Sequence, residues 1–156
     1  MRSVFACKFE KLFLLLAIGL VLAVSATGAS RADEIGERQK YMKANSEQMK
    51  VLAPMFKGDV PFDAAKVVAS AAIIQNDFAN ARLLFPAGST SKDSAALDII
   101  WTENAAFLAG FDKGESAAAA VAAAGQAGNE TAFKTAFMEL GGACKACHEK
   151  YRKPSN

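Results

Sequence analysis

The segment ETAFKTAFMELGGACKACHEKYR, residues 130–152, carries a helical pattern through its whole length. Its apolar residues recur in steps of three and four, which is the spacing of one helix face. These residues are Phe133, Phe137, Leu140, Cys144, Cys147 and Tyr151. The segment therefore predicts a helix from Glu130 to Arg152 that turns both cysteines toward the interior of the fold.

The same segment contains the pattern Cys-Lys-Ala-Cys-His at residues 144–148. Two cysteines three positions apart, with a histidine directly after them, form the attachment signature of c-type haem. In that chemistry the thiols of Cys144 and Cys147 add to the haem vinyl groups, and His148 supplies the proximal iron ligand. His148 is the only histidine in the chain. We predict one covalently attached haem c.

Other uses of the cysteine pair fit the sequence less well. A zinc site takes about four ligands, whereas the only other cysteine of the chain is Cys7. A redox-active Cys-x-x-Cys pair normally belongs to a βαβ unit, and the sequence shows no alternating strand pattern. A disulfide within one helical turn would be strained. These comparisons favour haem attachment.

The first 32 residues have the composition of a secretory signal peptide. A basic start precedes a short apolar core at residues 12–24, and small residues stand just before Asp33. This order is typical of export signals, and the apolar run is short for a membrane span. We predict a signal peptide at 1–32, one mature domain at 33–156, a periplasmic location and no stable membrane insertion after cleavage. An uncleaved anchor is the alternative.

Removal of the signal peptide changes the charge of the protein. The full chain has 18 Lys and Arg against 16 Asp and Glu. The predicted signal peptide holds four of these basic residues and one acidic residue, so 14 basic and 15 acidic residues remain, a net charge of −1. The basic balance belongs to the precursor, and we expect no nucleic-acid partner.

Three further helices are predicted before the last one, at Ile35–Phe56, at Asp63–Leu84, and from Asp93 or Ser94 through the alanine-rich run. Segments rich in glycine and proline separate them. Four amphipathic helices with short links favour an antiparallel up-down-up-down bundle. The predicted class is all-α: a four-helix bundle with covalent haem, preceded by a cleaved signal peptide.

Over residues 34–153 the chain resembles the class II c-type cytochromes, the group of cytochrome c′ and cytochrome c-556. The resemblance rests on the haem motif near the C-terminus, the opening ERQKYMK at 37–43, and Leu84-Phe85-Pro86 with Ile100-Trp101. Cytochrome c′ is itself a known example of the four-helix bundle. In class I cytochromes the motif comes early and a methionine ligand follows, whereas no methionine follows His148 here.

The resemblance leaves two alternatives for the sixth iron ligand. It places Met42 on the distal side of the haem. Ligation by Met42, which we favour, implies an electron carrier with periplasmic redox partners. If Met42 only covers the iron, the resemblance implies a five-coordinate cytochrome c′ that binds NO or CO as a buffer or sensor. An enzyme such as a peroxidase ranks last, because no histidine remains for the distal side.

The resemblance also assigns roles to two arginines. It implies that Arg38 lies near a haem propionate and that Arg152 lies near the proximal haem face. The alternative for each is a solvated surface charge. Lysines 145, 150 and 153 surround the motif and could dock an acidic redox partner, with solvation as the alternative. Family members often form dimers, so a homodimer is a further expectation that the sequence leaves open.

Overall fold

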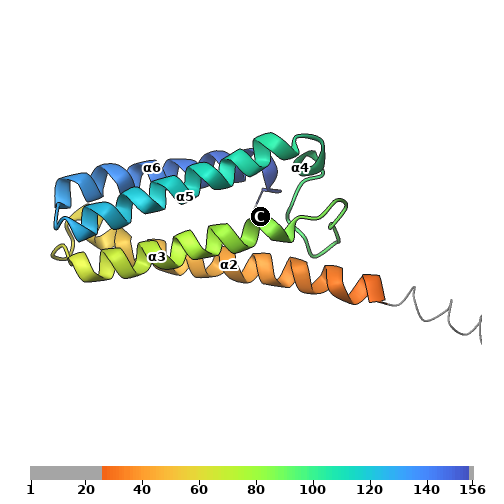
Figure 1. The fold of residues 1–156 in the computed structure, drawn as a ribbon, viewed down its shortest axis with the longest axis horizontal. Coiled ribbons are helices and arrows are strands. Elements are labelled where there is room, and N and C mark those ends of the chain that lie inside the picture. The colour runs from red at the N-terminus through yellow and green to blue at the C-terminus, as the bar shows by residue number, and fades with distance from the viewer. Residues whose placement is uncertain (1–25, 155–156) are drawn as a thin grey trace, which may run out of the picture. The chain divides into compact units, whose positions relative to one another are not determined.

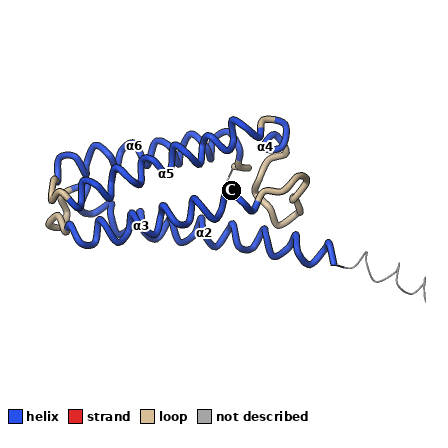
Figure 2. The backbone as a smooth tube through the Cα atoms, viewed as in Figure 1, coloured by secondary structure: helices blue, strands red, loops and turns tan. Residues whose placement is uncertain are grey.

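The structure is a computed structural model that describes residues 26–154, with side chains from Asp33 onward. Its elements are α2 (Ala26–Lys57), α3 (Ala64–Ala81), the 3-10 turn η1 (Arg82–Leu84), α4 (Ile99–Thr102), α5 (Asn104–Gln126) and α6 (Glu130–Tyr151). The described part of the chain is helical throughout, apart from loops and one isolated bridge (Figure 2). The compact unit considered below is Glu34–Asn156. The predicted all-α class is confirmed.

The four long helices lie side by side, and consecutive ones run in opposite directions (Figure 1). Both short connections contain a glycine with positive φ, Gly58 at 80° and Gly128 at 61°, a conformation that glycine adopts without strain. The side chains of Asp63 and Asn129 then cap α3 and α6 by accepting a backbone N–H three residues on. Turn and cap signals in the sequence therefore set the ends of these helices.

The third predicted helix begins later than expected. The sequence predicted its start at Asp93 or Ser94, but residues 85–98 form an irregular segment and α4 begins only at Ile99. After a break at Glu103 the chain continues as α5. The second predicted helix is also shorter, because its last turn is the 3-10 turn η1.

The reason for the late start is tertiary. The backbone N–H of Leu97 donates to the carbonyl of Tyr151 at 2.9 Å, and that of Lys153 donates to the carbonyl of Ala95 at 2.8 Å. Ala96 and Arg152 thus form an antiparallel bridge. These backbone groups bond the end of α6 instead of closing a helical turn.

One end of the bundle is close-packed. We call it the closed end; it lies beside the two short connections. Its buried core residues are Leu52, Met55, Val67, Ala71, Ile74, Val121, Phe133 and Leu140, all at most 2% exposed. A Cβ on Gly125 would lie 2.9 Å from side-chain methyls of both Val67 and Val68. The glycine at 125 therefore lets valine side chains of α3 pack directly against the backbone of α5.

The predicted signal peptide falls mostly outside the described residues, which begin at Ala26. Among the helices of residues 26–154, none is long and apolar enough to cross a membrane.

Candidate haem-binding site

The Cys-Lys-Ala-Cys-His pattern occupies the last two turns of α6, at the opposite end of the bundle from the closed end. We call this the open end. Cys144, Cys147 and His148 are each half-buried, whereas Lys145 and Ala146 between the thiols are exposed. Both cysteines are free thiols packed against the core. The helix face that the sequence predicts to point inward is therefore the face that carries the two cysteine thiols.

Two cavities, of about 230 and 240 Å³, lie at this end and share four lining residues: Met42, Phe111, Cys147 and His148. The first extends along α2 and α6 past Cys144. The second extends toward the irregular segment 85–98. Because Met42 comes from α2 and His148 from α6, residues from two different helices line both cavities.

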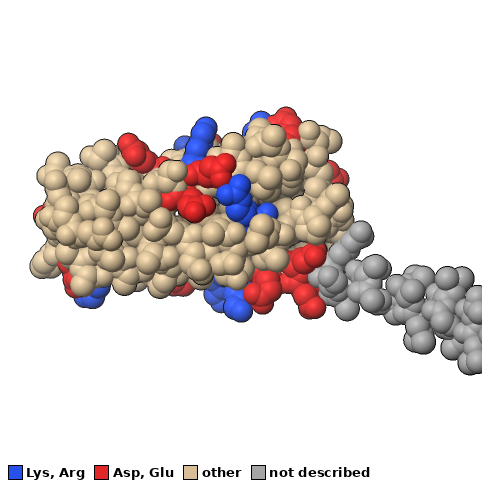
Figure 3. All heavy atoms as spheres, viewed as in Figure 1, with Lys and Arg blue, Asp and Glu red and all other residues tan. Residues whose placement is uncertain are grey.

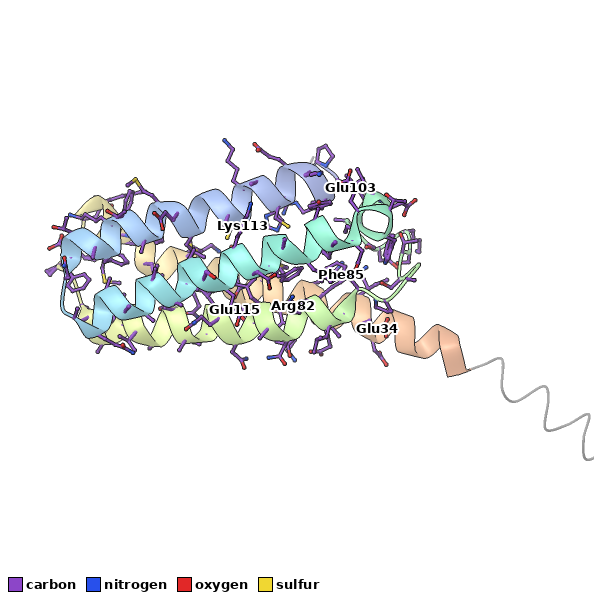
Figure 4. All side chains as sticks on the ribbon, turned by 45° about the horizontal axis from the view of Figure 1, so that its top comes forward. Glu34, Arg82, Phe85, Glu103, Lys113 and Glu115 are labelled. Carbon is purple, nitrogen blue, oxygen red and sulfur yellow. The ribbon has the colours of Figure 1, made fainter. Side chains whose placement is uncertain are left out.

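Aromatic side chains line the inner edge of the site. The ring of Phe107 lies 4.8 Å from that of Phe85, 5.3 Å from Phe111 and 5.2 Å from Tyr151, centroid to centroid, each pair in an edge-to-face arrangement. Figure 4 labels Phe85 of this group. Such a rigid apolar wall suits a planar aromatic ligand.

Two glycines of α5 keep the site open. A Cβ on Gly110 would stand 3.6 Å from the sulfur of Cys147, and one on Gly114 would stand 2.8 Å from the ring of Phe78. Gly114 thus receives the ring that lines the first cavity, and Gly110 leaves the thiol uncovered. Helix α5 continues through both glycines.

Burial sets the protonation of the three motif side chains. It raises the pKa of both thiols, and the neighbouring Cys147 adds to the effect on Cys144. The pKa of His148 is lowered, first by burial and then by the positive charge of Arg152. The imidazole is therefore neutral at neutral pH, the form whose nitrogen lone pair can bind a metal. These residues fit a covalently attached haem.

Arg38 is buried, only 4% exposed, so it is not a solvated surface charge. Its Nη2 donates to the Ser89 carbonyl at 2.7 Å and to Ser94 Oγ at 2.8 Å, and its Nη1 donates to the Leu84 carbonyl at 3.2 Å. The guanidinium also lies 4.5 Å from the ring centroid of Phe85. Arg38 lines the second cavity, but most of its donors hold the irregular segment in place.

Arg152 follows the last turn of α6, is exposed, and lines the same second cavity as Arg38. The structure therefore brings both predicted arginines together with His148 at one cavity. Their predicted contacts with haem stay predictions. The two arginines give the lining of the second cavity positive charge. Apart from His148, the residues that line the first cavity are neither acidic nor basic.

The three lysines near the motif have partners within the chain. Lys145 lies 3.7 Å from Glu149, Lys150 pairs with Glu103, and Lys153 donates to the Ser94 carbonyl at 2.9 Å. Two of these lysines thus pair with a glutamate and the third bonds a backbone carbonyl, and their role in docking a redox partner stays a prediction.

Charges on the bundle surface are mixed. Arg82 lies 2.7 Å from Asp112 and 3.9 Å from Glu115, joining the end of α3 to α5. Figure 3 shows acidic and basic side chains next to each other near the middle of this face, and Figure 4 labels Arg82 and Glu115. This face therefore carries no patch of a single sign.

Sequence reasoning missed Asn45, whose side chain is buried and lines the first cavity. Its position in the sequence could have predicted this, because Asn45 follows Met42 by three residues and so lies on the same face of the helix. Sequence reasoning also missed the contact between Phe107 and Phe85, because this contact joins helix α5 to the irregular segment 85–98, and no local sequence pattern indicates it.

Comparison with known proteins agrees with this site. The family model described as Cytochrome C' matches residues 33–152. Cytochrome c′ from Rhodopseudomonas palustris is 39% identical over 135 residues, covering 86% of this chain and 91% of that protein. Cytochrome c-556 from Agrobacterium fabrum is 39% identical over 124 residues, covering 78% and 82%.

A solved structure shows the same fold. The nitric oxide complex of a mutant cytochrome c prime from Alcaligenes xylosoxidans superposes with a TM-score of 0.75 at 27% identity, covering 80% of this chain and 97% of that one. The predicted resemblance is thereby confirmed. The chain belongs to the cytochrome c′ family, the class II c-type cytochromes.

Proposed function

We propose that this protein is a periplasmic electron carrier with one haem c attached through Cys144 and Cys147. His148 would be the proximal iron ligand and Met42 the distal one. One observation carries the proposal: Met42 and His148 line the same two cavities from different helices. A planar group held by the thiols would then have an imidazole nitrogen and a thioether sulfur as its available axial donors.

The bound haem would supply one-electron exchange between ferric and ferrous iron. The chain's own residues do the rest. Thioether links from Cys144 and Cys147 would hold the macrocycle, and the neutral imidazole of His148 would keep a lone pair for the iron. The aromatic wall around Phe107 would shield the haem ring from water. A rigid bundle of this kind keeps structural change small between the two oxidation states.

The proposal includes export and processing. Residues 1–32 would act as the signal peptide, and residues 33–156 would form the mature cytochrome, which meets haem and its redox partners in the periplasm. Relatives include both cytochrome c′ and cytochrome c-556. No substrate turnover is part of this role, so we do not propose an enzyme.

The second candidate function is gas binding by five-coordinate iron. It is favoured by the first cavity, which continues past Met42 to Asn45 and Met49 and so offers space on the α2 side. The related cytochrome c prime whose nitric oxide complex is known has the same fold. In this case Met42 would cover the iron without binding it, and NO or CO would take the sixth position.

Optical spectra of the purified holoprotein test the two candidates. With Met42 as a ligand, the ferrous protein shows a sharp low-spin α band that CO leaves unchanged. Met42→Ala should then give a broad high-spin spectrum that responds to CO. Met49→Ala, two turns further along α2 and lining the same cavity, is the matched control and should leave the low-spin band. A wild-type spectrum that is already broad and CO-sensitive would reject the electron carrier and support gas binding.

A further inference from the structure

Asn45 presents an unsatisfied amide to the first cavity. Its side chain is only 7% exposed, and neither Oδ1 nor Nδ2 has a hydrogen-bond partner among the described residues. A buried amide without partners is costly, and such groups are rare in folded proteins. The amide therefore stands where a further hydrogen-bonding group would satisfy it.

The position of Asn45 restricts what that group can be. It lies three residues after Met42 on the same face of α2, while Cys144, Cys147 and His148 line the cavity from α6. With His148 as proximal ligand, the amide belongs to the opposite, distal side. The haem propionates are poor candidates, because the arginines that suit carboxylates, Arg38 and Arg152, line the second cavity.

We propose that Asn45 donates a hydrogen bond from Nδ2 to the sixth ligand of the haem iron. The inference rests on the proposed haem site. The sixth ligand would be one of two hydrogen-bond acceptors. It is the thioether sulfur of Met42 if Met42 ligates, and a diatomic gas if the iron is otherwise five-coordinate. In both cases the donor draws electron density away from the iron through the ligand. Hydrogen bonds to a metal ligand tune the reduction potential of the metal and its affinity for that ligand.

The test replaces Asn45 with leucine, which has a similar size and no donor. In the wild-type background, if Met42 ligates, the reduction potential should fall, because a sulfur without the hydrogen bond donates more electron density to the iron and stabilises the ferric state. In the Met42→Ala background, the CO complex should show a higher C–O stretching frequency, because the positive end of the amide no longer favours electron donation into CO. CO dissociation should accelerate about fivefold to tenfold, the effect of one hydrogen bond.

Two variants serve as controls. Asn45→Gln keeps the amide and should retain a lower C–O stretching frequency than Asn45→Leu. Lys43→Leu introduces the same apolar side chain at an exposed position two residues earlier on α2 and should change none of the measurements. If Asn45→Leu does not accumulate, Asn45→Ala removes the amide without adding bulk and gives the same comparison.

The outcomes separate this inference from the proposed function. A wild-type protein without covalent haem absorbance would reject the haem site itself. A haem-loaded Asn45→Leu protein with unchanged potential, unchanged C–O stretching frequency and unchanged CO dissociation would overturn the role of Asn45 while leaving the haem site intact. A changed potential in the wild-type background identifies Met42 as the acceptor; changes confined to the CO complex identify the gas.

Discussion

The two ends of this bundle use the same four helices in opposite ways. At the closed end, side chains such as Leu52, Val67 and Phe133 are completely buried, and the backbones of α3 and α5 approach each other at Gly125. At the open end, Cys144 and His148 are only half-buried and line cavities. Because close packing supplies much of a fold's stability, the closed end stabilises the bundle while the open end leaves space for a cofactor.

Polar contacts add to the aromatic packing at the open end. Arg38 bonds the segment 85–98, and backbone hydrogen bonds join that segment to the end of α6. Hydrogen bonds have directions, so they can hold a cavity wall in place without filling the cavity. The comparison predicts that charge and hydrogen-bond changes matter most at the open end, and that volume changes matter most at the closed end.

The largest expected effect on stability comes from Arg38→Met. The variant keeps most of the side-chain length but removes the charged hydrogen bonds to Ser89 and Ser94, so we expect a loss of about 3 kcal/mol in the free energy of unfolding. Urea unfolding of the holoprotein measures it. Arg82→Met is the matched control, since Arg82 pairs with Asp112 at the surface and such pairs contribute at most about 1 kcal/mol. Equal losses in both variants would contradict the structural role of Arg38.

A smaller effect is expected when a methyl group is added at the closed end. Gly125→Ala places Cβ 2.9 Å from the methyls of Val67 and Val68, so α3 and α5 must separate. We expect a loss of about 1–2 kcal/mol, as overpacking usually costs. The same change at Gly141, where a Cβ meets nothing within 4 Å, should add up to about 1 kcal/mol through helix propensity. Thermal unfolding measures both; a gain in both variants would show that the closed end has unused space.

The smallest effect concerns Asp77 and depends on pH. Its carboxylate is buried, Oδ2 has no partner among the described residues, and burial raises its pKa. The folded state therefore favours the protonated carboxyl more than the unfolded chain does. Stability from this group is highest at acidic pH and falls as the pH rises through the raised pKa, because folding must then bury a charge.

The substitution Asp77→Asn removes the stability loss that ionisation of Asp77 causes as the pH rises. We expect stabilisation on the order of 1 kcal/mol at neutral pH, shrinking as the pH approaches the ordinary carboxylate range. Melting temperatures across this pH range measure the difference, with the exposed Asp59→Asn as control. A benefit for Asp77→Asn that grows toward acidic pH would have the wrong sign for a buried carboxylate.

Much of the fold was predictable because local signals set it. Caps at Asp63 and Asn129 and the positive-φ glycines Gly58 and Gly128 mark the two short connections, and the periodicity of α6 places its cysteines on one face. The start of the third helix was not predictable. Residues 93–98 have helical potential, but their backbone groups bond to a strand-like end of the chain that is more than fifty residues away.

The sequence by itself determined the chemistry: the spacing of Cys144, Cys147 and His148 fits haem attachment whatever surrounds it, because the motif lies within two turns of one helix. Only the tertiary structure decided what faces that motif. It brought Met42, which the family resemblance pointed to, to the same cavities as His148, buried Arg38 against a loop, and left the amide of Asn45 without a partner among the described residues. These properties depend on contacts between α2 and distant segments, and burial is a property of the packed chain that no local pattern encodes.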